Sequence, residues 1–283
     1  VVTLPCAVVP GYFKIEPRKT YGHVSDGMCA SERELGLGDS HEGIILLRDY
    51  GFTPQEYKAL KPGDDAMHLL HLDQPILEIN ITPDRGYAFS YRGVAREYHH
   101  STGAKFVDPV TELNKRAPAA PAAESGVSSD IEVIVDDNNP IHGVTGCDRY
   151  VARAIHGFDP TNHTPNWMRR RLIRAGMRSI SLAVDVTNYV MLDLGQPMHA
   201  YDLDKIEGPI VVRRAAEGEK LTTLDGKEHD LSVEDLLITD SPDGKRGSRI
   251  LGIAGVMGGL YGEVTADTKN ILLELSLIHI SEP

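Results

Sequence analysis

The side chains best suited to chemistry occur in a short stretch beyond the middle of the chain. Asp185 is a typical helix N-cap residue and Pro197 stops a helix from continuing, so the residues between them predict a short helix followed by a stiff loop. Thr187 and Asn188 then lie in the first turn of that helix, and His199 lies in the loop. A hydroxyl, an amide and an imidazole near a helix N-terminus suit a polar or anionic ligand. The alternative is a capped helix whose Thr187 and Asn188 bond the local backbone, with His199 simply packed.

Two further features follow downstream. Segment 250–259 carries four glycines among apolar residues, which lets backbone approach a ligand closely and offers amides to a carboxylate or phosphate. It lacks the Lys-Ser/Thr pair of a phosphate-binding P-loop. Glu274 lies inside an apolar strand predicted at 270–275, where a carboxyl group is costly unless it is paired or functional. In the alternative arrangement, Leu273 points inward and Glu274 points outward.

Composition and charge limit the class of protein. With 283 residues and 41% hydrophobic residues, the chain can bury one large core or two to three smaller ones. The three cysteines are far apart and indicate neither a disulfide framework nor a zinc site, which favours a reducing cytoplasm. No apolar run reaches the roughly 18 residues of a membrane span. We expect no metal site, and no Ser-His-Asp or Cys-His signature indicates a covalent nucleophile.

The formal net charge of −12 argues against a generally basic nucleic-acid-binding surface. A local basic patch can still contact phosphates. One cluster lies on a predicted helix, and its arginines either contact RNA phosphates or form a solvated helix face. A second set near the N-terminus contacts phosphates or simply carries surface charge. The candidate RNA-binding residues are Lys14, Arg18, Lys19, Arg169, Arg170 and Arg174.

The elements that must position these residues divide the chain into units. Short β-type runs between glycine-rich breakers predict a partial β-barrel over 1–60. A strand at 75–82, a turn at 83–86 and a helix at 89–101 predict a small strand-turn-helix unit within 61–114. Residues 115–129 have the composition of a linker, and 130–275 read as a mixed α/β module with a tight hairpin at Asp225-Gly226. The predicted fold class is therefore α+β. The start without methionine and the abrupt segment 276–283 indicate a fragment with a non-native tail.

Several of these segments resemble one family in the family's own order. They are Ser-Asp-Gly-Met-Cys-Ala-Ser-Glu-Arg-Glu-Leu-Gly at 25–36, Thr-Pro-Asp-Arg-Gly-Tyr-Ala at 82–88, Asp-Val-Thr-Asn-Tyr-Val at 185–190, Gly-Gln-Pro-Met-His-Ala-Tyr-Asp at 195–202 and Ala-Gly-Val-Met-Gly-Gly at 254–259. Together they are similar to bacterial phenylalanyl-tRNA synthetase β subunits. The resemblance implies a partial tRNA-binding OB-fold at 1–60, the second half of a split N-terminal domain at 61–114 and an editing module at 130–275. Ile-Ser-Leu-Ala at 180–183 departs from the family's Ile-Asn-Asn-Val.

The resemblance also implies a function. The family attaches phenylalanine to tRNA(Phe) in the cytoplasm as an α2β2 assembly whose α subunit holds the ATP and Mg²⁺ sites, so we expect no cofactor in this part. The editing module hydrolyses tyrosine wrongly attached to that tRNA. By motif, Glu274 would accept the phenol hydroxyl, with Ala254 and Gly255 as pocket wall. His199, Thr187 and Asn188 would surround the ester and the terminal adenosine. The rival interpretations are an RNA-binding scaffold with an inactive pocket and a freestanding editing hydrolase.

Overall fold

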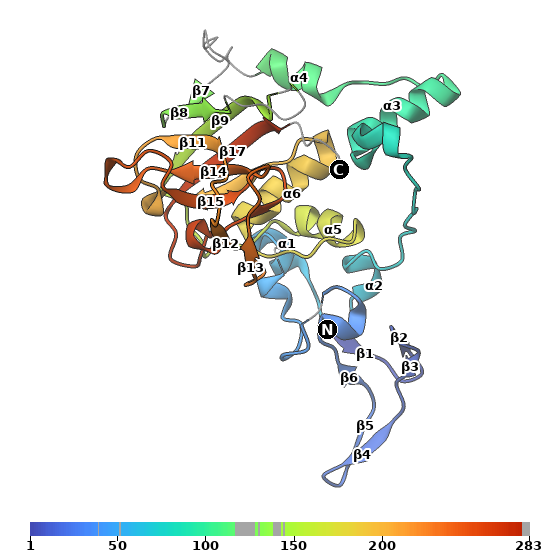
Figure 1. The fold of residues 1–283 in the computed structure, drawn as a ribbon. Coiled ribbons are helices and arrows are strands. Elements are labelled where there is room, and N and C mark those ends of the chain that lie inside the picture. Colours follow the sequence, from blue (N-terminus) through green and yellow to red (C-terminus); the bar gives the residue numbers. More distant parts are fainter. Residues whose placement is uncertain are drawn as a thin grey trace. The chain divides into compact units, whose positions relative to one another are not determined.

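The computed structural model describes residues 1–38, 40–50, 52–116, 128–129, 131–137, 143 and 145–278. These residues form two compact units, each discontinuous in sequence. The first contains Val1–Asn80 and Asn162–Asp185, and the second contains Ile81–Thr161 and Val186–Pro283. Figure 1 shows the elements of both units. No helix among the described residues is both long and apolar enough to cross a membrane.

The first unit combines short antiparallel ladders with short helices. Its described strands pair as three separate two-stranded ladders and not as a closed barrel, so the partial OB-fold stays a prediction. The paired strands are β1 (Val2–Thr3) with β6 (Met28–Cys29), β2 (Val8–Val9) with β3 (Phe13–Lys14), and β4 (Arg18–Thr20) with β5 (His23–Ser25). The helical elements are η1 (Arg33–Leu35), η2 (Leu47–Asp49), α1 (Pro54–Ala59), α2 (Ala66–Leu69) and α5 (Asn166–Arg174). The core of the unit contains Leu37, Ile45, Tyr50 and Leu70, with Ile173 of α5 packed against it.

The strand predicted at 75–82 is wrong. These residues carry no regular secondary structure, and the apolar side chains of Ile76, Leu77 and Ile79 are exposed. An alternating segment becomes a strand only when a partner satisfies its backbone groups, and no described residue supplies one here. The helix predicted next to it is confirmed as α3 (Tyr91–Thr102), preceded by η3 (Pro83–Phe89) and ended by Gly103 at φ +72°. The strand-turn-helix unit therefore lacks its strand.

The second unit is built around two sheets, whose strands in Figure 1 run from green (β7, β8 and β9) through orange to red (β17). The four-stranded sheet has the order β10 (His199–Asp202), β17 (Asn270–Ile278), β9 (Cys147–His156), β7 (Ser128–Ser129). The five-stranded sheet has the order β16 (Met257–Gly258), β15 (Arg249–Ile253), β14 (Leu236–Asp240), β11 (Ile210–Arg214), β8 (Val133–Asp136). Buried residues of both sheets share one apolar core, which includes Tyr150, Tyr201, Ile238 and Leu272.

Smaller elements complete the second unit. The hairpin predicted at Asp225-Gly226 is confirmed by the pairing of β12 (Lys220–Thr222) with β13 (Glu228–Asp230). The other elements among the described residues are α4 (Pro109–Arg116), the greater part of α6 (Leu182–Leu194), η5 (Leu203–Lys205), η6 (Pro242–Gly244) and η7 (Leu260–Gly262).

Two predicted boundaries fall inside elements. The linker expected at 115–129 begins within the last turn of α4 and ends in β7, while 117–127 lie outside the described residues. The tail expected at 276–283 begins within β17, because Ser276 pairs with Tyr150 in the ladder between β17 and β9. Residues 279–283 lie outside the described residues. The apolar alternation at the end of β17 continues the strand past the predicted boundary.

Candidate functional site

A cavity of about 510 Å³ lies in the second unit between the edge of the four-stranded sheet and the glycine-rich turn that joins β15 to β16. The end of α6 and the loop after it close another side. Its lining residues are Met191, Gly195, Gln196, Pro197, Met198, His199, Tyr201, Ile238, Gly252, Ile253, Ala254, Gly255, Val256, Met257, Gly258, Glu274 and Ser276. Four of the predicted site residues, His199, Ala254, Gly255 and Glu274, thus line the same cavity.

The register between β10 and β17 brings the two titratable side chains together. His199 is directly opposite Glu274 in the antiparallel ladder. Side chains opposite each other lie on one face of a sheet with Cβ atoms about 4.5–5.5 Å apart. Because side chains alternate along a strand, Tyr201 follows His199 on that face and Ser276 follows Glu274. His199 begins β10, so the structure places it on a strand and not in the loop that the sequence predicted.

The Glu274 carboxylate is buried and accepts two hydroxyl groups. The Tyr201 hydroxyl donates to Oε2 at 2.7 Å, and the Ser276 hydroxyl donates to Oε1 at 3.1 Å. No Lys or Arg forms an ion pair with it within the described part of the chain. Burial, followed by the charge of Glu274, raises the pKa of Tyr201 well above its usual value. The Tyr201 hydroxyl therefore remains a donor at neutral pH, and Glu274 points into the cavity instead of outward.

The His199 imidazole lines the cavity, and its Nε2 atom lies close to Gly258. This nitrogen is buried and has no hydrogen-bond partner among the described residues. Burial lowers the pKa of His199, although the nearby Glu274 charge works in the opposite direction. The ring lies edge-on to Tyr201 with centroids 4.5 Å apart. A neutral imidazole with one unused nitrogen can accept a proton from water or donate to a ligand.

Glycine residues let the wall approach this imidazole. A Cβ atom on residue 258 would lie only 2.6 Å from Nε2 of His199, so only glycine fits there without moving the ring. Gly255 has φ +72°, a left-handed conformation that suits the turn between β15 and β16. The backbone N–H of Ala254 donates to the carbonyl of Leu236 at 2.8 Å, which fixes the wall to β14.

Thr187 and Asn188 do not line this cavity. They lie on α6 about one helical turn or less before Met191, which does line it, so roughly 6 Å of helix rise separates Thr187 from Met191. The predicted convergence of Thr187 and Asn188 with His199 at a helix N-terminus is wrong, because α6 meets the cavity with its C-terminal part.

The start of α6 explains this difference. The helix begins at Leu182, so Asp185 lies inside it and is not its N-cap. The Asp185 carboxylate instead accepts from the backbone N–H of Ile180 and from the hydroxyls of Thr164 and Ser179. Asp185 is completely buried and ties the entry of α6 to the segment before it.

The basic residues predicted to contact RNA lie in the first unit. Lys14 on β3 and Arg18 and Lys19 on β4 are exposed, with a 3.9 Å ion pair between Lys14 and Glu16. On α5, Arg169 is largely buried, pairs with Glu32 and stacks on the Tyr50 ring at 4.0 Å, so it does not point outward as expected.

Arg170 and Arg174 line a second cavity of about 460 Å³ within the first unit. Burial lowers the pKa of Arg170, and Arg174 donates to Gln74 and to the carbonyl of Pro75. Contact of these arginines with RNA stays a prediction.

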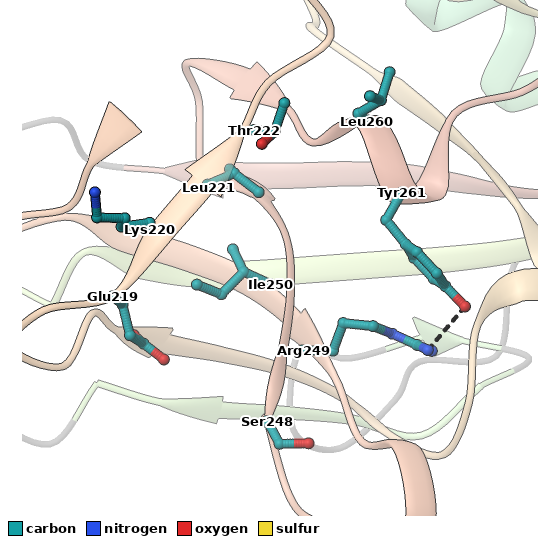
Figure 2. Close-up of a pocket in the computed structure, with 9 residues that line it drawn as sticks. All are labelled: Glu219, Lys220, Leu221, Thr222, Ser248, Arg249, Ile250, Leu260 and Tyr261. Atoms are coloured by element: carbon teal, nitrogen blue, oxygen red, sulfur yellow. Dashed lines mark hydrogen bonds between the residues drawn. The ribbon is translucent and has the colours of Figure 1, made fainter. Parts of the chain in front are cut away.

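A third hollow, about 640 Å³ and open, lies beside β12, β15 and η7 (Figure 2). Its charged side chains already have partners: Glu219 binds Arg213, Lys220 binds Glu228 and Asp230, and Arg249 binds Asp240. Within the described part of the chain, no group of three or more His, Cys, Asp or Glu side chains has the arrangement of a metal site.

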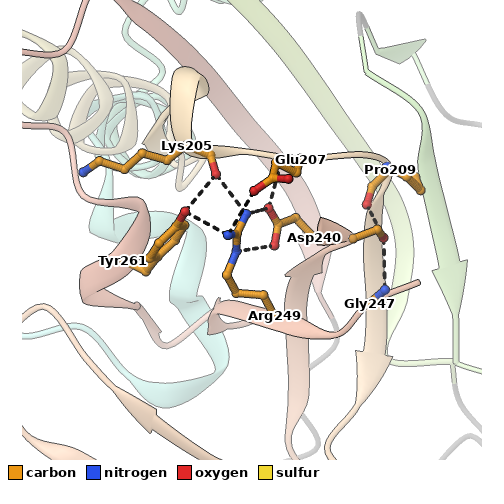
Figure 3. A network of polar contacts seen from close by, with 8 residues as sticks. Lys205, Glu207, Pro209, Asp240, Gly247, Arg249 and Tyr261 are labelled. Carbon is orange, nitrogen blue, oxygen red and sulfur yellow. Dashed lines mark hydrogen bonds and ion pairs between the residues drawn. The ribbon is translucent and has the colours of Figure 1, made fainter. Parts of the chain in front are cut away.

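Arg249 belongs to a network that supports the wall of the candidate site (Figure 3). It donates to both carboxylate oxygens of Asp240, to the carbonyl of Lys205 and to the hydroxyl of Tyr261. The Asp240 side chain is fully buried, and Arg249 stacks on the Tyr261 ring at 4.1 Å. Since Arg249 begins β15, this network fixes the strand that leads into the glycine-rich turn.

The part of the chain that forms the cavity matches a known protein family. Residues 146–281, which contain all its lining residues, match the family described as the B3/4 domain. Over 97% of its length the chain is 81% identical to the phenylalanine–tRNA ligase beta subunit of Bifidobacterium longum and 52% identical to that of Leifsonia xyli. The chain belongs to the phenylalanine–tRNA ligase beta subunit family.

The chain spans about a third of these relatives, covering 32% and 31% of their lengths. An N-terminal fragment of the phenylalanyl-tRNA synthetase beta subunit from Pyrococcus horikoshii also matches, over 80% of this chain and 63% of that one, at 17% identity. Its TM-score of 0.39 is too low to support an argument about the fold.

Sequence reasoning missed two residues that bind Glu274. Tyr201 lies in the motif at 195–202 without an assigned role, and Ser276 lies in the predicted tail. Both lie two residues from a predicted site residue on a strand, which places them on the same face. That spacing is the signal available in the sequence.

Proposed function

We propose that this chain is the part of a phenylalanine–tRNA ligase β subunit that removes tyrosine wrongly attached to tRNA(Phe). One observation supports this most directly: a buried carboxylate, Glu274, faces a cavity and already accepts a phenol hydroxyl there. The cavity therefore has the chemistry to recognise the group that distinguishes tyrosine from phenylalanine.

The selectivity follows from the cost of an unmatched acceptor. A tyrosyl group entering the cavity donates its hydroxyl to Glu274, while a phenylalanyl group displaces water and offers no donor in its place. Leaving a buried polar group without its hydrogen bond costs about 1–3 kcal/mol, and more for a charged group. Sites built to bind a hydroxyl therefore reject the analogue that lacks it. Ala254 and Gly255 form the wall against which the ring lies.

His199 supplies the hydrolytic step. An aminoacyl ester is already activated, so hydrolysis needs a positioned water molecule more than a strong nucleophile. Nε2 of neutral His199 has no partner among the described residues, and a small shift of the ring from Gly258 lets it accept a hydrogen bond from that water and orient it toward the ester carbonyl carbon. The water oxygen bonds to this carbon, the bond from the carbon to the tRNA ribose oxygen breaks, and a proton of the water passes to the ribose oxygen. Tyrosine and free tRNA then leave. Thr187, which is buried, and Asn188 lie nearer the start of α6, outside the cavity, and take no part in this step.

The remaining proposals concern the whole ligase. In the cytoplasm, this β subunit pairs with an α subunit as an α2β2 heterotetramer that attaches phenylalanine to tRNA(Phe). ATP and Mg²⁺ serve that reaction on the α subunit, and no cofactor is proposed for the cavity described here. Lys14, Arg18, Lys19, Arg170 and Arg174 are the candidate contacts to tRNA phosphates.

The test is deacylation of Tyr-tRNA(Phe) and Phe-tRNA(Phe) by the 283-residue chain and by Glu274→Gln. The substitution keeps the size of the side chain but replaces one acceptor oxygen by an amide donor. We expect the wild type to release tyrosine selectively, and Glu274→Gln to lose at least tenfold in the ratio of the two kcat/KM values, since a factor of ten corresponds to about 1.4 kcal/mol.

His199→Ala serves as the second variant. It should slow release of tyrosine while leaving the preference between bound esters intact, because it removes the water-orienting group and not the acceptor. If a folded wild-type chain, verified by circular dichroism, releases neither ester, the chain acts as an RNA-binding scaffold with an inactive pocket. Equal release of both esters would contradict the role of Glu274.

A further inference from the structure

The cavity contains a tyrosine of its own at the recognition carboxylate. Tyr201 is 2% exposed, lines the cavity and donates its hydroxyl to Oε2 of Glu274 at 2.7 Å. Its ring belongs to the apolar core of the second unit and lies edge-on to His199. The chain thus places a phenol hydroxyl where a tyrosyl ligand would place one.

This contact changes what a ligand hydroxyl gains. A carboxylate has two oxygens with about four acceptor sites in all. Tyr201 occupies one site on Oε2 and Ser276 occupies one on Oε1, so a ligand hydroxyl is the third donor. The absence of a hydrogen bond from the ligand costs less when the carboxylate already accepts two hydrogen bonds from the protein than when it accepts only one. The penalty for a phenyl ligand is correspondingly smaller.

We propose that Tyr201 is a specificity-determining residue whose hydroxyl competes with the ligand hydroxyl for Glu274 and limits the preference for phenol over phenyl ligands. The inference rests on the function proposed above and assigns a further residue to the same site. Tyr201 acts through Glu274 and takes no part in the hydrolytic step.

Tyr201→Phe isolates this effect. The phenyl ring keeps the core packing and the contact with His199, and only the hydroxyl is removed. Glu274 then retains a single resident donor, Ser276, and a tyrosyl ligand restores the second. If the Tyr201 hydroxyl merely held Glu274 in position, the same substitution would release the carboxylate and lower the preference for phenol ligands. The two roles therefore predict opposite changes in the preference for phenol ligands over phenyl ligands.

Tyr150→Phe is the matched control. Tyr150 is a completely buried tyrosine on β9 whose position is paired with that of Ser276. Burial, followed by the charge of Glu274, raises the pKa of Tyr150, but its hydroxyl forms no hydrogen bond of ordinary geometry among the described residues. The substitution removes a buried phenol oxygen near Glu274 without removing either of the hydrogen bonds from Tyr201 and Ser276. A change in selectivity caused by general disturbance of the core would appear in both variants.

The experiment measures two ratios with the full 283-residue chain, its Tyr201→Phe variant and its Tyr150→Phe variant. The first is the ratio of kcat/KM for Tyr-tRNA(Phe) to that for Phe-tRNA(Phe). The second is the ratio of the affinities for L-tyrosinamide and L-phenylalaninamide, measured by calorimetry. We expect both ratios to rise about tenfold in Tyr201→Phe, the lower end of the effect of a hydrogen bond to a charged group. In Tyr150→Phe we expect a much smaller change, because the Tyr150 hydroxyl lies in the field of Glu274 but forms no hydrogen bond with it.

The two readouts separate failure of this inference from failure of the proposed function. Unchanged or lower ratios in Tyr201→Phe overturn the inference even where tyrosine is released selectively. If no variant releases either ester, the hydrolytic function fails, and the amide affinities alone decide the role of Tyr201. Absence of tyrosinamide binding by both wild type and Tyr201→Phe also overturns the inference, because the cavity then accepts no phenol.

Discussion

Gly258→Ala tests whether the wall of the cavity sets the position of His199. A Cβ atom at residue 258 would lie 2.6 Å from Nε2 and 2.7 Å from Cε1 of His199, and 3.2 Å from Cδ1 of Leu224. Ordinary contact begins at 3.4 Å, so the imidazole must retreat by 3.4 − 2.6 = 0.8 Å. A misplacement of about 1 Å in a positioned reacting group costs about 100-fold in rate. We therefore expect tyrosyl-ester hydrolysis to fall about 100-fold.

Stability provides a second readout of the same clash. Inserting a methyl group into a packed site costs about 1–3 kcal/mol, and we expect Gly258→Ala to lower the free energy of unfolding in urea by that amount. In a His199→Ala background the ring is absent, so the loss should largely disappear. Gly86→Ala is the control, because nothing lies within 4 Å of the position that its methyl group would take and its backbone needs no left-handed conformation. Wild-type hydrolysis in Gly258→Ala, or an equal loss of stability in both backgrounds, would refute this account of the wall.

Two further predictions use groups around the site. Burial lowers the pKa of His199, so the folded chain favours the neutral ring. Tyrosyl-ester hydrolysis should therefore stay constant above about pH 6.5 and decline only below it. The contribution of the neutral ring to the free energy of unfolding is complete above the unfolded pKa of about 6.5 and should be lost as pH falls below that value. A pH–rate profile and urea unfolding at each pH check this, and a hydrolysis decline that begins above pH 7 would contradict it. Arg249→Met leaves the fully buried Asp240 carboxylate unpaired, and we expect it to lower the free energy of unfolding by about 3–5 kcal/mol. Arg246→Met breaks a more exposed pair with Asp136 and should lower the free energy of unfolding by less than about 1 kcal/mol. Equal losses in the two arginine variants would show that the network in Figure 3 does not stabilise the sheet.

The sequence is most informative where a motif lies on a strand or in the turn that forms the site. The sequence predicts His199, Ala254, Gly255 and Glu274 as site residues, and the structure brings all four to one cavity. Their roles stay predictions. The sequence alone could not show that His199 and Glu274 are direct partners, because a ladder between distant segments depends on the register that the whole core selects.

Local patterns failed where tertiary context decides the outcome. Asp185 has the side chain of an N-cap, but its buried carboxylate bonds to Thr164, Ser179 and Ile180, and the helix begins earlier. That shift moves Thr187 and Asn188 out of the first turn, and neither lines the cavity that His199 lines. Segment 75–82 alternates like a strand yet has no partner among the described residues. In both cases the deciding hydrogen bonds lie outside the window that the pattern covers.

The register between β10 and β17 is the feature on which the site depends most. Three side chains, His199, Tyr201 and Glu274, share one face of this ladder, and Ser276 follows on the same face of β17 just beyond it. A shift of one residue would turn the side chains of a whole strand to the opposite face, so either strand would lose both of its site residues together. The bond between Tyr201 and Glu274 opposes such a shift, because breaking it would leave a buried carboxylate short of a donor. The contact that we expect to limit selectivity therefore also stabilises the register that forms the cavity, which gives a physical reason for retaining a tyrosine where phenylalanine would select more strongly.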